Sequence, residues 1–342
     1  MPSRFGFKDL ILLVVAVGVG VSVWLGMVQQ DRHWRELRRI SQKQADLERS
    51  LARLGGSVGG AMAPSPPDQS WARPGVPVVR SPEWSYTSDP RSMPGYAAGG
   101  ELTEVFEGGP GTLLPFLKGE NTYSRRINAL VVQSLGTYDP RTLAVRGLLA
   151  DGWQEDPAGL WLRVHINPRA RFSDGEPVRA SDVRWTFHEF LFNARLDTGD
   201  LRPVFDVISR VEAVDAHTVE FAFGERLFSN MFQAMTLPVL PEHFYGPLAP
   251  AKINAATGLL IGSGPYKLES LEWAPPADVV LVRDEAYWGP RPALERLRFR
   301  PIGDPQARLT AYRNGEAGGG APPPPPVVAA RAGAGGGGGE NN

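Results

Sequence analysis

Hydrophobic residues are grouped unevenly along the chain, and the longest group is a continuous apolar run from Leu10 to Val28. About 20 apolar residues cross a bilayer as a helix, whereas the core of a signal peptide is usually about 7–15 residues long. The run therefore predicts an uncleaved transmembrane helix over residues 10–28, after a short tail over residues 1–9. A long signal peptide is the alternative.

The next segment, residues 31–54, has apolar residues at alternating spacings of three and four, which is the a/d pattern of a coiled coil. The run is shorter than about three heptads, so its pairing would be marginal without a membrane anchor. It predicts a juxtamembrane helix that is either solvated on all sides or paired as a homodimer. The apolar positions of the seam are Leu37, Ile40, Leu47, Leu51 and Leu54, with Gln44 as its polar member.

Two segments have the composition of disordered chain. Residues 55–98 are rich in Gly, Pro and Ser and poor in aliphatic residues, so they cannot bury enough surface to offset the entropy of ordering. They predict a tether, whose root-mean-square reach is about 35 Å for a flexible chain of roughly 45 residues. In the predicted low-complexity tail at residues 317–342, Pro322–Pro326 favours polyproline II and Gly335–Gly339 favours random coil.

Residues 99–316 carry the periodicities of a mixed α/β fold, with a two-residue alternation in some segments and a three-to-four-residue spacing in others. The predicted strands are Glu101–Phe106, Leu160–Ile166, Val211–Val214 and Thr218–Phe223. The predicted helices are Ile127–Leu135, Leu148–Trp153, a helix from about Asp182 with an apolar stripe, and Asp304–Arg313. The members of that stripe are Val183, Phe187, Phe190, Leu191 and Ala194.

Turn-rich segments punctuate this region, and although each is common alone, their order is informative. They are Thr112–Pro115, Thr137–Pro140, Phe172–Val178, Leu237–Phe244, Gly262–Leu268, Arg283–Gly289 and Pro292–Leu297. In wording and order they resemble the bacterial extracellular solute-binding proteins of family 5, the oligopeptide, dipeptide and nickel type. Gln133-Ser134 departs from the family's usual Glu-Gly. Arg179 replaces its capping Thr, which leaves Ser181 as the expected cap.

The resemblance implies an α/β fold, namely a periplasmic-binding-protein-like type II lobe with a mixed sheet and flanking helices over residues 99–316. Family members close two lobes on a ligand by a hinge motion. The second lobe and the closing strands of the first are missing from this sequence, so a truncated lobe with unsatisfied sheet edges is expected. A truncated or frameshifted gene and a genuine short protein both remain open.

Composition excludes several functional classes. The formal net charge is −1, from 36 basic and 37 acidic residues, so no global field favours nucleic acid as a partner. Cysteine is absent, which excludes disulfides, thiolate metal sites, cysteine nucleophiles and a lipidated cysteine. The five histidines include no metal-binding i,i+4 pair, and Ile261 occupies the position where a nucleophile elbow at Ser263 needs glycine. No metal, cofactor or catalytic residue is predicted, and the protein is not expected to be an enzyme.

The resemblance implies noncovalent ligand binding, and the best positions for it are loops at strand ends, where a rigid sheet presents polar backbone. Ser263 and Gly264 would offer backbone N–H groups and Tyr266 a stacking face, with a simple crossover turn at Gly264-Pro265 as the alternative. Trp288 is one of several tryptophans that could line a cleft, although packing is the commoner role. The candidate ligand-binding residues are Gly109, Thr112, Tyr123, Ser263, Gly264 and Tyr266.

The implied function is that of a membrane-anchored substrate-binding component of an ABC importer, which captures a peptide or similar small solute for a permease and its ATPase subunits. Such a protein would pass once through the inner membrane and hold its globular domain in the periplasm. The flanking charges conflict with this orientation, because basic residues are denser after the span than before it, which favours a cytoplasmic C-terminal side. The alternative function is a tethered sensor or interaction protein that reuses a single lobe without transport.

Overall fold

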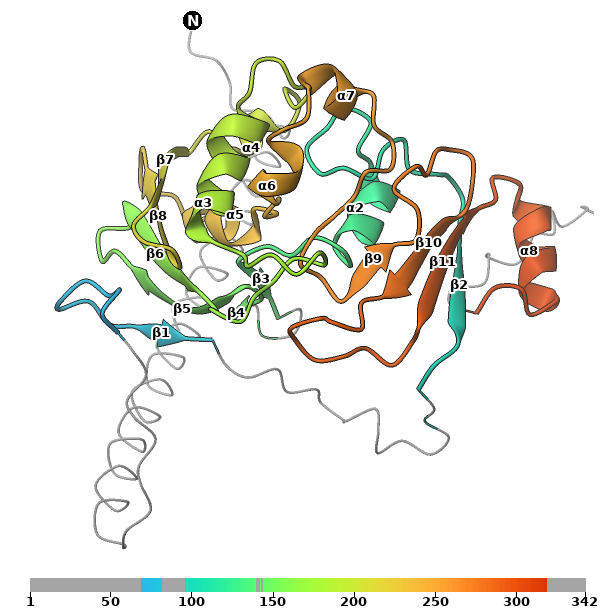
Figure 1. Ribbon diagram of the computed structural model, residues 1–342, viewed down its shortest axis with the longest axis horizontal. Helices are drawn as coiled ribbons and strands as arrows, with labels where there is room; N and C mark the ends of the chain where they lie inside the picture. The colour runs from blue at the N-terminus through green and yellow to red at the C-terminus, as the bar shows by residue number, and fades with distance from the viewer. Residues whose placement is uncertain (1–68, 82–95, 97, 140–141, 143, 319–342) are drawn as a thin grey trace, which may run out of the picture. The chain divides into compact units, whose positions relative to one another are not determined.

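The computed structural model describes residues 69–81, 96, 98–139, 142 and 144–318 (Figure 1). They belong to the second of two units into which the chain divides, Asp68–Asn342.

Several sequence predictions fall outside these residues and stay predictions. They are the transmembrane helix at 10–28, the juxtamembrane helix at 31–54, and all but the first two residues of the tail at 317–342. Within the part of the chain that the structure describes, no helix has the length and apolar character needed to cross a membrane.

The larger sheet has five strands, which are β1 (Val79–Arg80), β5 (Ala150–Glu155), β6 (Trp161–Ile166), β7 (Ile208–Ala213) and β8 (Thr218–Phe223). They lie in the order β1-β5-β6-β8-β7, and all neighbours are antiparallel (Figure 1). On β6, Leu162, Val164 and Ile166 are buried while the residues between them are partly exposed. The half-buried strand predicted here is therefore confirmed, as is the hairpin of β7 and β8.

The smaller sheet has four strands, which are β2 (Glu101–Phe106), β9 (Tyr266–Leu268), β10 (Val279–Arg283) and β11 (Arg296–Pro301). Their order is β2-β11-β10-β9, so β2 lies parallel to a strand that follows it by almost two hundred residues (Figure 1). Ion pairs strengthen this pairing, because the Glu101 carboxylate contacts Arg296 at 3.1 Å and Arg298 at 2.6 Å. A two-stranded sheet, β3 (Gly136–Tyr138) and β4 (Val145–Gly147), lies before β5 in the sequence.

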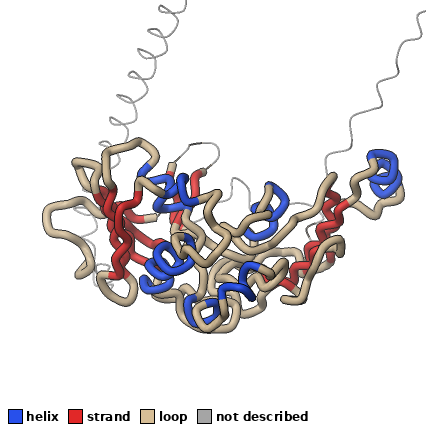
Figure 2. The backbone as a smooth tube through the Cα atoms, turned by 90° about the horizontal axis from the view of Figure 1, so that it is seen from above, coloured by secondary structure: helices blue, strands red, loops and turns tan. Residues whose placement is uncertain are grey.

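The helices are short, and apart from α8, which lies beyond the smaller sheet, they lie with long loops between the strands of the two larger sheets (Figure 1 and Figure 2). They are α2 (Thr122–Asn128), α3 (Ala180–Trp185) with a π-helical continuation η2 (Thr186–Leu191), α4 (Arg202–Phe205), α5 (Asn230–Thr236), α6 (Glu242–Tyr245), α7 (Pro250–Asn254) and α8 (Pro305–Arg313). Helix α3 packs on β7 and β8. The predicted apolar stripe is buried at Val183, Phe187, Phe190 and Leu191, whereas its last predicted member, Ala194, lies after η2 and is exposed.

The sequence predicts Ser181 as the cap of this helix. In the structure, Asp182 closes the first turn of α3 instead. Its carboxylate accepts hydrogen bonds from the backbone N–H of Arg179 at 2.8 Å and of Glu242 at 3.0 Å. Burial raises the pKa of Asp182, and the two N–H donors oppose that shift. One buried carboxylate thus joins the starts of two helices.

Two helix predictions are wrong. Residues Leu148–Trp153, predicted as a helix, form the turn into β5 and most of that strand. Leu149 and Trp153 are both buried, and their spacing of four imitates a helical stripe. Pairing of β5 with β6 on one side and β1 on the other overrides that local pattern. The helix predicted at Ile127–Leu135 lies earlier, at Thr122–Asn128, because the Asn121 side chain caps its first turn by accepting from the N–H of Ser124.

The predicted tether at residues 55–98 also needs correction. Residues 69–81, here called the strap, lie inside that range but are folded against the larger sheet, where they contribute β1. Trp71 is only 5% exposed. The composition of the segment is poor in aliphatic residues as a whole, but this tryptophan stacks on the ring of His165 and lies against Gly152 of the sheet.

The segment that leads into β9 crosses closely over the backbone that follows α2. The N–H of Gly264 donates to the carbonyl of Val131 at 2.8 Å, and the N–H of Tyr266 donates to that of Leu130 at 3.2 Å. A Cβ atom on Gly264 would lie 2.5 Å from the Leu130 carbonyl oxygen and 2.8 Å from that of Val131. Both neighbours are backbone atoms, so the crossing requires glycine.

Replacement of Gly264 by alanine is expected to destabilise the protein by about 1–3 kcal/mol, because the added methyl group forces the two backbones apart. Gly199→Ala is the matched control, since a Cβ atom on Gly199 would meet nothing within 4 Å, and a change within about 0.5 kcal/mol is expected there. Urea unfolding of the full-length variants measures both values. Equal stability of the two variants would contradict the proposed crossing.

Candidate functional site

A hollow of about 600 Å³ opens between the larger and smaller sheets, here called the inter-sheet hollow. One wall comes from β4, the start of β5 and the Asn167–Arg169 turn, and the other from Pro265 and the Tyr287–Pro292 loop. Ala129 and Gln133, just beyond α2, complete it. Hollows of roughly 300–1,000 Å³ that combine aromatic faces with a few polar groups are the usual form of small-molecule sites.

The aromatic wall consists of Tyr287 and Trp288, whose ring centroids are 5.8 Å apart in an edge-to-face arrangement. The Trp288 Nε1 donates to the Ser263 carbonyl at 3.1 Å, and the Gln133 Nε2 donates to the Tyr287 hydroxyl at 2.9 Å. Both rings are half-buried. They are held at their polar ends, so each keeps a fixed orientation beside the hollow.

The polar wall carries opposite charges. The Asp151 carboxylate lies 2.7 Å from Nδ1 of His165 and 3.8 Å from a guanidinium nitrogen of Arg80. Arg169 is exposed, and its backbone N–H donates to the side chain of Asn167 at 3.0 Å. The Asp151 carboxylate, the Arg169 guanidinium and the primary amide of Asn167 thus lie around one hollow. The rings of Tyr287 and Trp288 form its other wall. This set can hold a ligand with amide groups and charged ends.

Two of the predicted ligand-binding residues lie together, at the end of β2. The Asn121 side chain donates to the Gly109 carbonyl at 3.0 Å, and the Tyr123 hydroxyl donates to Glu107 at 3.3 Å. A Cβ atom on Gly108 would lie 2.9 Å from the Tyr123 ring, so this glycine lets the loop approach the ring. Gly109 is exposed and Tyr123 half-buried, and they form a small surface apart from the residues that line the inter-sheet hollow.

The other four predicted residues are buried. The Thr112 hydroxyl donates to the Ala256 carbonyl at 3.1 Å, and the Tyr266 hydroxyl donates to that of Leu294 at 3.1 Å. The Gly264 N–H is already bonded to Val131. The predicted roles of that N–H group and of the Tyr266 ring face therefore do not match this structure, and Gly264-Pro265 has the geometry of the alternative, a crossover turn. Ser263 is 1% exposed and supports the site through its carbonyl.

The residues that line the hollow were mostly missed by sequence reasoning. Gln133 carried one usable signal, since it departs from the family's usual glutamate. Trp288 was a candidate only as one of several tryptophans, with packing as the commoner role. Asp151 lies inside the segment that the sequence predicts as a helix. Arg169 lies in the turn after β6, which has no distinctive sequence pattern. No local periodicity brings these four positions together.

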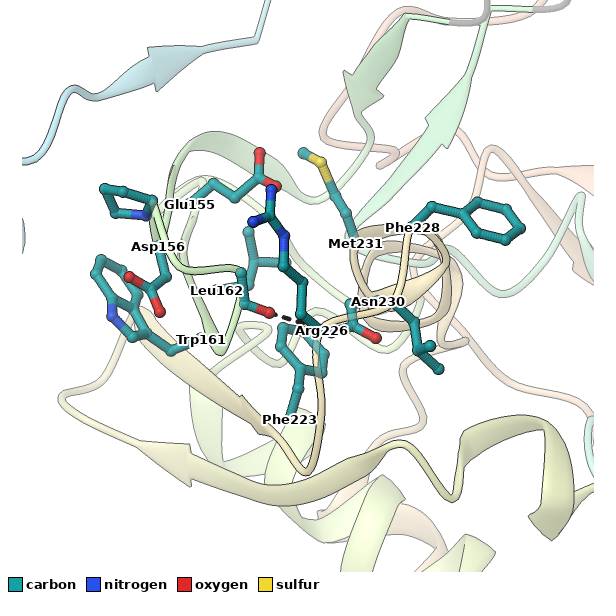
Figure 3. Close-up of a pocket in the computed structure, with 12 residues that line it drawn as sticks. Glu155, Asp156, Trp161, Leu162, Phe223, Arg226, Phe228, Asn230 and Met231 are labelled. Atoms are coloured by element: carbon teal, nitrogen blue, oxygen red, sulfur yellow. Dashed lines mark hydrogen bonds between the residues drawn. The ribbon is translucent and has the colours of Figure 1, made fainter. Parts of the chain in front are cut away.

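A second hollow, of about 490 Å³, lies where the β5–β6 turn meets the loop before α5 (Figure 3). The Asn230 side chain donates to the Gly159 carbonyl at 3.2 Å and fixes the two loops together. Arg226 and Glu155 extend along one side, and Phe228 points away from the hollow. The Phe228 side chain is fully exposed.

Comparison with known proteins assigns the chain to a family. The profile described as "Bacterial extracellular solute-binding proteins, family 5 Middle" matches residues 144–337, more than half of the chain. The protein therefore belongs to the bacterial extracellular solute-binding proteins of family 5, and the resemblance noted in its sequence is confirmed.

Similar individual proteins agree with that assignment. The chain is 30% identical over 216 residues to the peptidoglycan-binding protein YepA of Agrobacterium fabrum, a match covering 58% of this chain and 33% of YepA. The oligopeptide-binding protein AppA from Bacillus subtilis, solved with a nonapeptide, superposes with a TM-score of 0.55 at 23% identity, covering 65% of this chain and 44% of AppA. DppA from Helicobacter pylori, solved with the peptide STSA, gives a TM-score of 0.57 at 20% identity and covers 65% and 46%.

These matches confirm the predicted α/β, periplasmic-binding-protein-like fold. The chain spans about a third of the length of YepA and less than half of the solved neighbours. The comparisons therefore identify the family and the fold of this portion.

Tyr287→Phe is expected to destabilise the protein by about 1–3 kcal/mol, because the Gln133 amide, in a side chain only 6% exposed, loses the acceptor of a buried hydrogen bond. The matched control is Tyr312→Phe, at a tyrosine that is 44% exposed. Urea unfolding with unchanged m-values measures the difference. The hydrogen bond has no structural importance if both variants unfold at the same urea concentration.

Proposed function

We propose that this protein binds a peptide or a similar small solute, noncovalently, in the inter-sheet hollow. The observation that carries the proposal is one hollow of about 600 Å³ with Asp151 and Arg169 on one wall and Tyr287 and Trp288 on the other. Gln133 lines it beside Tyr287, to which its amide is hydrogen-bonded. Family membership supports it. Similar proteins support it as well, because one is named a peptidoglycan-binding protein and two were solved with bound peptides.

The chemistry of such binding follows from the wall residues. Arg169 suits a carboxylate, which it can hold by two parallel hydrogen bonds. Asp151 suits an ammonium or an amide N–H group, and the rings of Tyr287 and Trp288 offer faces to apolar or aromatic parts of the ligand. Binding of this kind needs fixed geometry and no reacting group, and so it fits a protein that captures a solute without changing it. We retain Gly109 and Tyr123 as proposed ligand contacts at a second surface.

For the whole protein, we propose a role as the substrate-binding component of an ABC importer, acting with a permease and ATPase subunits. In this proposal, residues 10–28 anchor the chain in the inner membrane and the family 5 portion lies in the periplasm. Long domains cross the membrane largely regardless of flanking charge, so the basic residues after the span are compatible with that orientation.

A tethered sensor or interaction protein is the second candidate. The heptad seam at Leu37, Ile40, Leu47, Leu51 and Leu54 favours it, because pairing through a coil would present two copies of the family 5 portion together. An importer must deliver its bound solute to a permease. A sensor requires only that ligand binding changes the arrangement of the two paired copies. The two candidates share the inter-sheet hollow as their ligand site.

Calorimetric titration of the full-length chain, held in lipid nanodiscs, with defined di- to pentapeptides tests the binding proposal. Saturable heat is expected for at least one peptide below millimolar concentration. Trp288→Ala should weaken that binding by about tenfold, since the loss of one aromatic contact of about 1–1.5 kcal/mol corresponds to that factor. Phe228→Ala, an exposed aromatic residue at the second hollow, should leave the affinity unchanged. Absence of saturable heat for every peptide at millimolar concentration would count against capture.

The proposed topology predicts which reporter enzymes work when fused after Asn342. Alkaline phosphatase should be active there, because it folds only outside the cytoplasm, and β-galactosidase should be inactive. The opposite pair of activities would place the family 5 portion in the cytoplasm and refute the importer proposal.

A further inference from the structure

The strap, residues 69–81, is bound to the larger sheet by a set of contacts that a passive tether does not need. The Trp71 ring stacks on His165 with centroids 5.1 Å apart, and the Trp71 carbonyl accepts from Arg163 at 3.0 Å. The Arg73 guanidinium lies 4.1 Å from the centre of the Trp161 ring. The strap therefore packs against side chains of β6.

A buried amide holds the backbone of the strap. Gln154 of β5 is 0% exposed, and its Oε1 accepts from the Arg73 N–H at 2.7 Å. Its Nε2 donates to the carbonyls of Arg73 at 3.1 Å and Val76 at 2.7 Å. A buried glutamine whose hydrogen bonds all go to one peptide segment is the kind of group that recognises backbone, since leaving it unpaired costs free energy.

Glycine at position 152 allows the strap to lie flat on the sheet. A Cβ atom there would lie 3.2 Å from the Val79 carbonyl oxygen and 3.4 Å from the Trp71 ring. Val79 pairs with Trp153 and Arg80 with Gly152 in the β1–β5 ladder. The surface beneath the strap is thus shaped to receive it.

The strap ends in the wall of the inter-sheet hollow. The Ser81 N–H donates to the Asp151 carbonyl at 3.1 Å, and the Ser81 hydroxyl accepts from the Gly147 N–H at 3.0 Å. Ser81, Gly147 and Asp151 all line the hollow. Contacts at Trp71 and Arg73 therefore continue, through β1, to a residue that holds the wall of the candidate site.

We propose that the strap is a positioning element of the ligand site: Trp71, Arg73 and Gln154 keep β1 docked, so that Ser81 fixes the wall from Gly147 to Asp151. This inference rests on the proposed function of the inter-sheet hollow. Because Ser81 is hydrogen-bonded to both Gly147 and Asp151, undocking at Trp71 loosens the wall and weakens ligand binding. By thermodynamic reciprocity, a ligand in the hollow strengthens docking of the strap by the same factor.

The absence of cysteine from the chain makes a single reporter thiol possible. Ala150 lines the hollow and is 4% exposed, so Ala150→Cys should react slowly with N-ethylmaleimide while the strap is docked. In the full-length chain, Trp71→Ala and Gln154→Leu should each raise that rate by about tenfold or more, because local opening exposes the wall without global unfolding. Gln154→Leu keeps the side-chain volume close to the original and serves if Trp71→Ala folds poorly.

Two further variants separate positioning from general stability. Trp71→Phe should keep most of the slow rate, since it retains an aromatic ring that can stack on His165, and the indole N–H that it loses has no hydrogen-bond partner among the described residues. Val211→Ala, on the outer strand β7 at the other end of the sheet, should also keep it although it destabilises the core. Rates for Trp71→Ala and Gln154→Leu equal to that of the parent would overturn the proposal.

Titration with tri-L-alanine adds a ligand-based test. The Trp71→Ala and Gln154→Leu chains, without the reporter cysteine, should bind it about tenfold more weakly than the parent chain, because the apparent Kd rises as the inverse of the docked fraction. Equal affinity in parent and variants would overturn the coupling between strap and ligand. Failure of the parent chain itself to bind any peptide counts against the proposed function, whereas the thiol rates judge the role of the strap independently.

Discussion

The crossing of Gly262–Gly264 over Leu130–Val132 is the backbone constraint that positions the start of the smaller sheet's β9 and one wall of the inter-sheet hollow. There, hydrogen bonds join two backbone segments directly, and a side chain on Gly264 would collide with backbone oxygen atoms. The crossing ends at Tyr266, where β9 begins, and it presents the Ser263 carbonyl to Trp288. The smaller sheet and the aromatic wall of the hollow are therefore both positioned by a contact that has no freedom to slide.

The hollow itself is assembled from segments that are distant in the sequence. Gln133 and Tyr287 are separated by 154 positions and Ser81 and Gly147 by 66, yet each pair is joined by a hydrogen bond. A site whose walls are tied in this way is largely pre-formed, which lowers the entropy lost when a ligand is bound. The same construction explains why a segment as modest as the strap can influence the hollow, because its last residue is one of the ties.

Elements whose structure is set by a local sequence pattern were predicted correctly, and those that depend on distant contacts were not. Strand β6 was predicted correctly because its alternation reports one buried face, and α8 was predicted correctly because Asp304, its N-cap, and Pro305 mark its start. Strand β5 was predicted as a helix because the spacing of four between Leu149 and Trp153 imitates a helical stripe, which pairing with β1 and β6 overrides. Of the candidate site residues, Gly109 and Tyr123 proved to be neighbours, whereas Gly264 and Tyr266 proved to be occupied by internal hydrogen bonds.

The sequence by itself determined the family, because its turn-rich motifs occur in the family's order, although each motif is common alone. It also determined the strands with a single buried face. Only the tertiary structure decided that Trp71 docks on β6, that Gln154 turns inward to hold the strap, and that Asp151, Arg169, Gln133 and Trp288 surround one hollow. Local periodicity reports which side of an element is buried, but the identity of the surface that covers it depends on contacts between residues far apart in the chain.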